Sequence, residues 1–214
     1  MIITYFGEQF FKIAQGDMVL AFNPVSKSAK SDIGAHFGAD IAFVTTNYPL
    51  YNGVEQLSHG ERMPFVISGP GDYEVKEVFI KGIMSNALIS GKNYINTIYS
   101  FSLDNINIAF LGALGDPEIS KEAHEAIDSP DILFIPIGGK NLSKEVSLLD
   151  AKTSAKLALE LEPKLIIPMS YDDSALKIFL KEIGEDRAEV VDKLTLKLKD
   201  LDGKEGEVII LKAI

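Results

Sequence analysis

Short apolar runs separated by tight turns fill the first half of the chain, and this pattern predicts antiparallel strands. Residues 2–6 and 10–13 form two such runs, and tight turns join them to a third at residues 18–22. Further runs predict strands over residues 41–45, 64–67, 73–75, 78–83, 96–103 and 106–111. Asp104-Asn105 is a candidate two-residue hairpin turn between the last two strands.

The second half of the chain changes to a helical period. Asp116 at the N-cap and Pro117 at the first helical position predict a helix over residues 118–127. Apolar stripes predict helices over residues 150–161 and 174–183, and Gly184 is expected to end the second. Strands are predicted over residues 131–137, 164–169, 193–198 and 207–211.

This order of elements predicts the architecture. Strands come first and a β-α-β-α series follows, without an internal repeat or an obvious linker. We therefore predict one domain over residues 1–214 in the α+β class. Its two sheets are expected to lie face to face with helices outside, as a four-layer αββα sandwich. The sequence leaves open whether the polar loop over residues 26–38 folds over the candidate binding cleft, whose residues are given below.

Composition narrows the range of partners. Hydrophobic residues make up 46% and charged residues 24%, and the net charge of −10 argues against binding to a nucleic-acid backbone. The chain has no Cys, which excludes disulfides and thiolate metal sites, and three His cannot build a His-rich site for two metals. With no apolar run of the roughly 18–20 residues that span a bilayer and no signal-peptide pattern, we expect a cytoplasmic protein without membrane contact.

Residues 40–52, D-I-A-F-V-T-T-N-Y-P-L-Y-N, are the centre of the candidate chemistry. An apolar strand pattern turns polar at Thr46 and breaks at Pro49. A strand that ends in such a loop resembles the metal-binding element of the metallo-β-lactamase superfamily, which carries T-H-x-H-x-D-H here. The four ligand places hold Thr46, Tyr48, Leu50 and Tyr51 in this chain.

Further stretches resemble one branch of that superfamily, the ascorbate-6-phosphate-lactonase-like proteins, known as β-lactamase-fold Zn-dependent hydrolases. The opening I-T-Y-F-G-E-Q-F-F-K-I and the strand V-L-A-F-N-P resemble the first strands of that branch. The turn S-G-P-G-D-Y-E-V and the strand I-A-F-L-G-A-L-G resemble its middle part. D-I-L-F-I-P-I-G-G and L-E-P-K-L-I-I-P-M-S-Y resemble its last core strands, so the resemblance extends to about Tyr171.

The departures from this family fall on its metal ligands. The resemblance implies a Zn or Mn site held by His and Asp, which activates a bound water. Ala113 stands in place of a bridging Asp, and Ser170 stands in place of a His. Glu8 occupies a slot that often holds His, and Asn23 replaces the Asp before the proline. These replacements predict a divergent member of the family that binds no metal, because each expected ligand has been replaced.

Two functions follow from these replacements. The first is a catalytically degenerate binding or assembly module without a cofactor, with a small-molecule ligand in the vestigial cleft or a homo-oligomer as its open partners. The second is an active hydrolase of lactones or phosphoesters, with Glu8 or Asp72 as general base or with a single hard cation. Whether the chain is an enzyme therefore stays open. The predicted cleft is lined by Glu8, Asn23, Thr46, Tyr48, Leu50, Tyr51, Asp72, Ala113 and Ser170.

Overall fold

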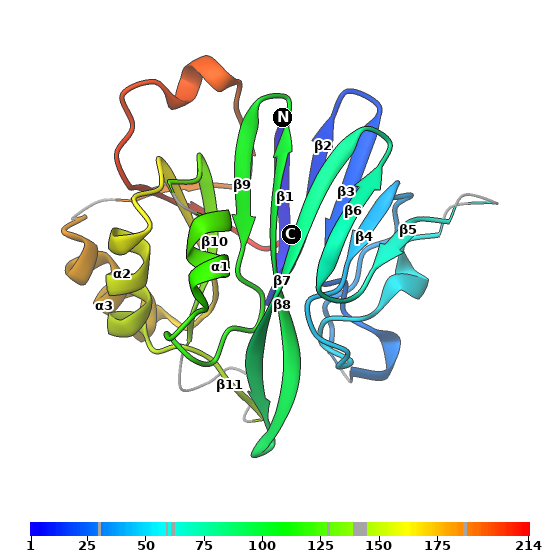
Figure 1. Ribbon diagram of the computed structural model, residues 1–214, viewed down its shortest axis with the longest axis horizontal. Helices are drawn as coiled ribbons and strands as arrows, with labels where there is room; N and C mark the ends of the chain where they lie inside the picture. Colours follow the sequence, from blue (N-terminus) through cyan, green and yellow to red (C-terminus); the bar gives the residue numbers. More distant parts are fainter. Residues whose placement is uncertain (30, 59, 61–62, 128, 139–144, 186–187) are drawn as a thin grey trace.

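Two β-sheets pack face to face, and the helices cover the outer face of the second sheet (Figure 1). The computed structural model describes residues 1–29, 31–58, 60, 63–127, 129–138, 145–185 and 188–214. This arrangement is the predicted α+β sandwich, so the predicted fold class is confirmed.

The first sheet has six strands in the order β14-β1-β2-β3-β4-β5. Its strands are β1 (Ile2–Gly7), β2 (Phe10–Gln15), β3 (Met18–Phe22), β4 (Ile41–Phe43), β5 (Phe65–Ile67) and β14 (Lys193–Thr195). β1, β2 and β3 form an antiparallel meander, whereas β3, β4 and β5 run parallel. The carboxyl ends of β3 and β4 therefore lie at the same edge of the sheet.

The second sheet follows the order β11-β7-β8-β9-β10-β12-β15-β13, with β6 paired to β7. Its strands are β6 (Gly71–Val75), β7 (Val78–Ile89), β8 (Lys92–Leu103), β9 (Ile106–Phe110), β10 (Ile132–Gly138), β11 (Val146–Ser147), β12 (Leu165–Tyr171), β13 (Glu189–Val191) and β15 (Glu207–Leu211). β7, β8 and β9 are antiparallel neighbours, whereas β9, β10, β12 and β15 run parallel. The carboxyl ends of β9, β10 and β12 thus also share one edge.

Among the described residues, three α-helices pack on the second sheet: α1 (Lys121–Ala126), α2 (Ala151–Glu160) and α3 (Asp173–Ile183). The Asp150 side chain caps α2, and Gly184 ends α3 with a left-handed φ of 84°. Within the described part of the chain, every helix is too short or too polar to span a lipid bilayer.

The outer layer over the first sheet is built from loops and from the short 3-10 helices Lys27–Ala29 and Val54–Gln56. In the loop over residues 26–38, Ile33 and Phe37 are among the described side chains that pack against the outward-facing Phe10. The described residues of this loop that pack in this way therefore cover the outer face of the first sheet, a position that the sequence had left open.

Aromatic side chains fill the space between the two sheets. Phe22 stacks on Phe43 within the first sheet, with ring centroids 4.4 Å apart. Across the interface, the edge of Phe11 meets Phe134 at 5.0 Å. These offset and edge-to-face pairs add to the burial of apolar area and fix the separation of the sheets.

The start of the first helix was predicted wrongly. α1 begins at Lys121, and its N-cap is Ser120, whose hydroxyl accepts a hydrogen bond from the N–H of Ala123 at 3.1 Å. Asp116 instead accepts a bond from the N–H of Glu118 at 2.9 Å within a local turn. Asp and Ser compete for the same capping role, and the later residue is the one that precedes the helix.

The hairpin of β7 and β8 was predicted too short. Both strands continue for twelve residues each, through stretches where Ser and Asn interrupt the apolar pattern. The turn at Asp104-Asn105 is confirmed, because both residues have positive φ values of 55° and 61°. Near the C-terminus, β14 is shorter than the predicted strand and the 3-10 helix Leu198–Leu201 follows it.

Candidate functional site

Most residues predicted to line the cleft lie at the edge where the carboxyl ends of parallel strands from both sheets meet. Asn23 follows β3 and Thr46 follows β4 in the first sheet, whereas Ala113 follows β9 and Ser170 is the second-last residue of β12 in the second. Parallel pairing brings strand ends of one sheet together, and face-to-face packing brings the two sets of loops together. The fold thus assembles residues that are far apart in the sequence.

Asn23 ties the loops of the first sheet together. Its Nδ2 donates to Gln9 Oε1 and to Thr45 Oγ1, each at 2.9 Å, and its Oδ1 accepts from the N–H of Thr45 at 2.9 Å. The side chain is fully buried, and its φ of 44° is one that Asn tolerates better than most residues. Asn23 therefore braces the loops after β3 and β4 and the turn before β2 through direct hydrogen bonds.

Asn96 on β8 holds the loops beside the second sheet together through hydrogen bonds. Its Oδ1 accepts from Thr46 Oγ1 at 3.2 Å and from the N–H of Ala113 at 2.9 Å. Its Nδ2 donates to the carbonyl of Leu111 at 2.9 Å and to Ser85 Oγ at 2.8 Å. One buried amide thus joins the loop after β4 to the loop after β9 and satisfies its own hydrogen-bonding groups.

Gly112 permits this close approach. Its φ is 63°, and a Cβ atom there would lie 2.5 Å from Asn96 Oδ1 and 2.7 Å from Thr45 Oγ1. Both the backbone conformation and the lack of space therefore require glycine.

An apolar cluster fills the cleft beside this network. Tyr51 is only 1% exposed and packs with Ala113, Ala87 and Ile89. Burial is the main reason that the pKa of Tyr51 is raised, so its hydroxyl stays neutral. The ring occupies volume between the loops and contributes to the packing of this edge.

Tyr48 and Leu50 close the same cluster at its outer side. Both are half-buried, and the Tyr48 ring meets Tyr94 edge-on at 6.0 Å. The Tyr48 hydroxyl donates to the carboxylate of Glu145, and this bond is the main cause that raises the pKa of Tyr48 to about 12. Tyr48 thereby links the loop after β4 to the segment that precedes β11.

Glu8 and Ser170 meet at the opposite wall of the cleft. Ser170 Oγ donates to Glu8 Oε2 at 3.3 Å, and the N–H of Ser170 donates to the Glu8 carbonyl at 3.1 Å. The Tyr5 hydroxyl donates to the same carbonyl at 3.0 Å. Burial raises the pKa of Glu8, and the bond from Ser170 opposes this shift. Both Glu8 and Ser170 have left-handed backbone conformations, with φ of 52° and 51°.

Asp72 does not join the other eight predicted residues. It lies exposed on β6, opposite Lys81 of β7, whereas Asn96 at the cleft is opposite Ser85. The two positions are four residues apart along β7, which is roughly 13 Å at about 3.3 Å per residue. The structure therefore gives Asp72 no contact with the cleft.

The donor set at the cleft does not fit the inherited metal site. In the described ranges, no group of three or more His, Cys, Asp or Glu side chains is placed to hold a metal ion. The positions that the resemblance assigns to ligands present hydroxyl, methyl, isobutyl and phenol groups, with Glu8 as their carboxylate. Zn sites are built from imidazole, thiolate and carboxylate groups, and these side chains supply too few of them.

Sequence reasoning missed three members of the cleft: Gln9, Thr45 and Asn96. Asn96 opens the strand predicted over residues 96–103, and the buried residues Thr97, Ile98 and Tyr99 follow it, so its burial was a weak signal. Gln9 and Thr45 gave no comparable signal, because both stand at the ends of strand patterns where polar residues are ordinary.

The comparison with protein families decides the ancestry of the fold. The model described as "Beta-lactamase superfamily domain" matches residues 2–170. The chain belongs to the β-lactamase superfamily. This membership confirms the superfamily that the sequence motifs predicted. No curated protein matches the chain at a significant level.

Solved structures support the same fold. A protein from Thermotoga maritima, assigned as a Zn-dependent hydrolase of the metallo-β-lactamase superfamily, is 24% identical with a TM-score of 0.76, covering 99% of each chain. Igni18, a metallo hydrolase from Ignicoccus hospitalis, is 15% identical with a TM-score of 0.61 and covers 99% of this chain and 95% of its own. An isothiocyanate hydrolase from Delia radicum gut bacteria is 11% identical with a TM-score of 0.60, covering 98% and 96%. These identities show a shared fold.

Proposed function

We propose that this chain is a metal-independent binding module of the superfamily, descended from the ascorbate-6-phosphate-lactonase-like branch. The observation that carries the proposal is the packing of Tyr51 against Ala113, at two places where the resemblance puts metal ligands. A buried phenol ring and a methyl group stand where imidazole and carboxylate groups would be needed.

The hydrogen-bond network supports the same proposal. Thr46 and the N–H of Ala113 are both satisfied by Asn96, so the frame of the cleft holds together through protein atoms. To bind an ion here, the chain would have to displace the Tyr51 ring and re-expose its apolar surface, at a cost of about 1.5–3 kcal/mol. The place where the resemblance puts the metal ligands is thus filled by side chains that pack together and hold the loops in position.

Metal binding tests this proposal directly. The full chain is purified without added metal, its metal content is measured, and it is then titrated with Zn²⁺ and Mn²⁺ by calorimetry. We expect less than one-tenth of an ion per chain and no saturable heat in the micromolar range. Binding of one or two ions per chain that weakens in Glu8→Gln would overturn the proposal, and Glu74→Gln on the exposed strand β6 is the matched control.

A second function, a hydrolase with a rebuilt site, is favoured by the Glu8–Ser170 pair. A carboxylate whose pKa is raised by burial is suited to act as a general base near neutral pH. The test is a screen of phosphodiester, lactone and ester substrates with wild type, Glu8→Gln and Asp72→Asn. Turnover that is lost only in Glu8→Gln would establish this function and replace the first proposal.

A further inference from the structure

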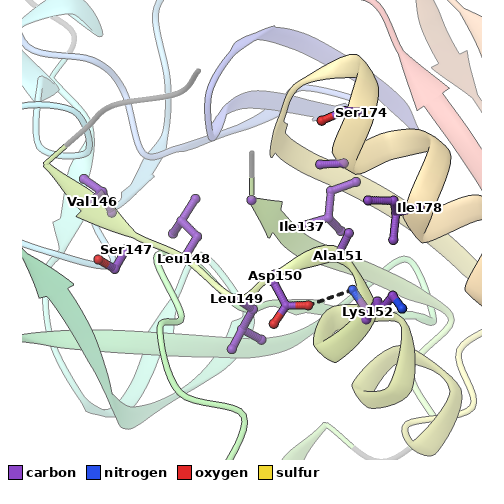
Figure 2. A pocket seen from close by; sticks show the side chains of 12 residues that line it. Ile137, Val146, Ser147, Leu148, Leu149, Asp150, Ala151, Lys152, Ser174 and Ile178 are labelled. Atoms are coloured by element: carbon purple, nitrogen blue, oxygen red, sulfur yellow. Dashed lines mark hydrogen bonds between the residues drawn. The ribbon is translucent and has the colours of Figure 1, made fainter. Parts of the chain in front are cut away.

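A cavity of about 530 Å³ lies between the end of β10, the segment over residues 146–152 and α3 (Figure 2). Ile137 of β10 lies between Val146 and Leu148 on one side and Ser174 and Ile178 of α3 on the other. This volume is in the range of small-molecule sites, which are concave and mostly apolar.

We propose that this cavity binds one small, uncharged and predominantly apolar molecule. Its position supports the proposal, because ligands of open α/β sheets bind outside the carboxyl ends of parallel strands. The cavity lies beside the carboxyl end of β10, whose parallel neighbours are β9 and β12.

The walls of the cavity are held in place before any ligand arrives. The N–H of Leu149 donates to the carbonyl of Leu114 at 3.1 Å, and Ser154 Oγ donates to the carbonyl of Pro136 at 2.8 Å. Gly138 has a φ of 63°, and a Cβ atom there would lie 2.5 Å from the Leu149 carbonyl oxygen. Leu149 is therefore held close to the end of β10, and β11 is paired to β7, so a preformed cavity saves the ligand the cost of ordering this segment.

The charged groups at the rim point to an uncharged ligand, because they already have partners. Asp150 accepts from the N–H groups of Lys152 and Thr153 at 3.0 and 3.1 Å, and the Thr153 hydroxyl is the main reason that the pKa of Asp150 is lowered. Lys152 Nζ lies 3.7 Å from a Glu182 oxygen. The exposed hydroxyl of Ser147 can supply a single polar contact to the ligand.

The cavity shares a wall with the cleft. Val146 and Leu148 line the cavity and also pack against the cluster that contains Tyr51 and Ala113. A ligand in the cavity would therefore lie one side chain away from the packed inherited site. The inference goes beyond the proposed function and does not depend on it, since neither metal nor turnover enters its test.

The test uses N-phenyl-1-naphthylamine, an uncharged apolar probe whose fluorescence rises in apolar sites. We expect saturable binding of one probe per chain. Ile178→Asp should weaken binding at least tenfold, because it places a charge in the apolar wall. Leu198→Asp is the matched control, since Ile178 is 41% exposed and Leu198 is 42% exposed, and it should bind as wild type does. Thermal unfolding of both variants verifies that they are folded.

A second measurement on the wild-type chain keeps the proposal independent of any variant. In a methyl spectrum recorded with the probe, the Ile137 and Ile178 methyl signals should shift, and those of the exposed Ile2 and Ile95 should not. Probe fluorescence that does not saturate, unchanged binding by Ile178→Asp, or shifts confined to Ile2 and Ile95 would each overturn the proposal. A positive Zn²⁺ titration would reject the proposed function and leave this inference standing.

Discussion

The hydroxyl of Ser170 donates a 3.3 Å hydrogen bond to the carboxylate of Glu8, a residue 162 positions earlier in the chain. The bond joins the end of β12 in the second sheet to the turn between β1 and β2 in the first. It places an ionisable group inside the junction of the two sheets, and this has a consequence for stability.

Glu8 should make the protein less stable as the pH rises. Burial raises the pKa of Glu8 above its ordinary 4.5, so the folded state prefers the protonated carboxyl. Its stabilising contribution is full below the unfolded pKa and is lost as the pH rises through the folded pKa. Glu8→Gln, which mimics the neutral form, should therefore melt at a higher temperature than wild type at pH 7, and the gap should close below pH 4.5.

Thermal unfolding of wild type and Glu8→Gln between pH 3 and pH 8 measures this gap, and Glu74→Gln on β6 is the exposed control. A Glu8→Gln variant that melts below wild type at pH 7 would show that the ionised carboxylate stabilises the fold.

Asn96→Ala should destabilise the protein by about 2–3 kcal/mol, because it leaves buried partners without their hydrogen bonds. Thr46 Oγ1 and the N–H of Ala113 are the groups affected on the cleft side. Asn93→Ala, at an exposed position of the same strand, should change stability by less than about 0.5 kcal/mol. Urea denaturation of both variants makes the comparison, and equal effects would refute the central role of Asn96.

Gly112→Ala should cost considerably more than Gly16→Ala. Both glycines have left-handed φ values, 63° and 56°, so both variants share a backbone cost of about 1–2 kcal/mol. Only Gly112 has an atom within 3 Å of the added Cβ, whereas Gly16 has nothing within 4 Å. We expect a difference of at least about 1 kcal/mol in the free energy of unfolding. Equal midpoints in urea would show that the loop after β9 can shift.

Two variants of Tyr51 distinguish a packing role of its ring from a chemical role of its hydroxyl. If its ring serves to fill space, Tyr51→Ala should cost about 3–5 kcal/mol, as large-to-small changes in cores do. Tyr51→Phe keeps the ring and should stay within about 1 kcal/mol of wild type, because the hydroxyl alone is removed. Denaturant unfolding of the two variants is the measurement, and a large loss in Tyr51→Phe would point to a role for the hydroxyl.

The sequence predicted correctly those elements that depend on a few neighbouring residues, such as short strands and helix ends. The short apolar run over residues 10–13 lies in β2, and Gly184 ends α3 as predicted because glycine accepts the left-handed cap. The start of α1 was predicted wrongly because Asp116 and Ser120 are both good caps and tertiary packing selected the second. The β7–β8 hairpin was predicted too short because pairing between strands carried it through Asn and Ser.

The sequence predicted which loops form the candidate site, but it did not predict every residue that takes part in it. Motif order placed Asn23, Thr46, Ala113 and Ser170 together, and the shared strand edge does bring them to one place. Asp72 was grouped with them through its neighbouring motif, yet the register of β6 holds it several residues away. Register is set by long-range pairing, which a single sequence does not reveal.

The contact between Asn96 and residue 113 is made by the N–H of Ala113, a main-chain group common to nearly all amino acids. This hydrogen bond is therefore independent of the side chain at residue 113, whereas the packing against Tyr51 depends on it. A substitution at residue 113 can thus keep the tie to Asn96 while it changes the volume that Tyr51 has to fill.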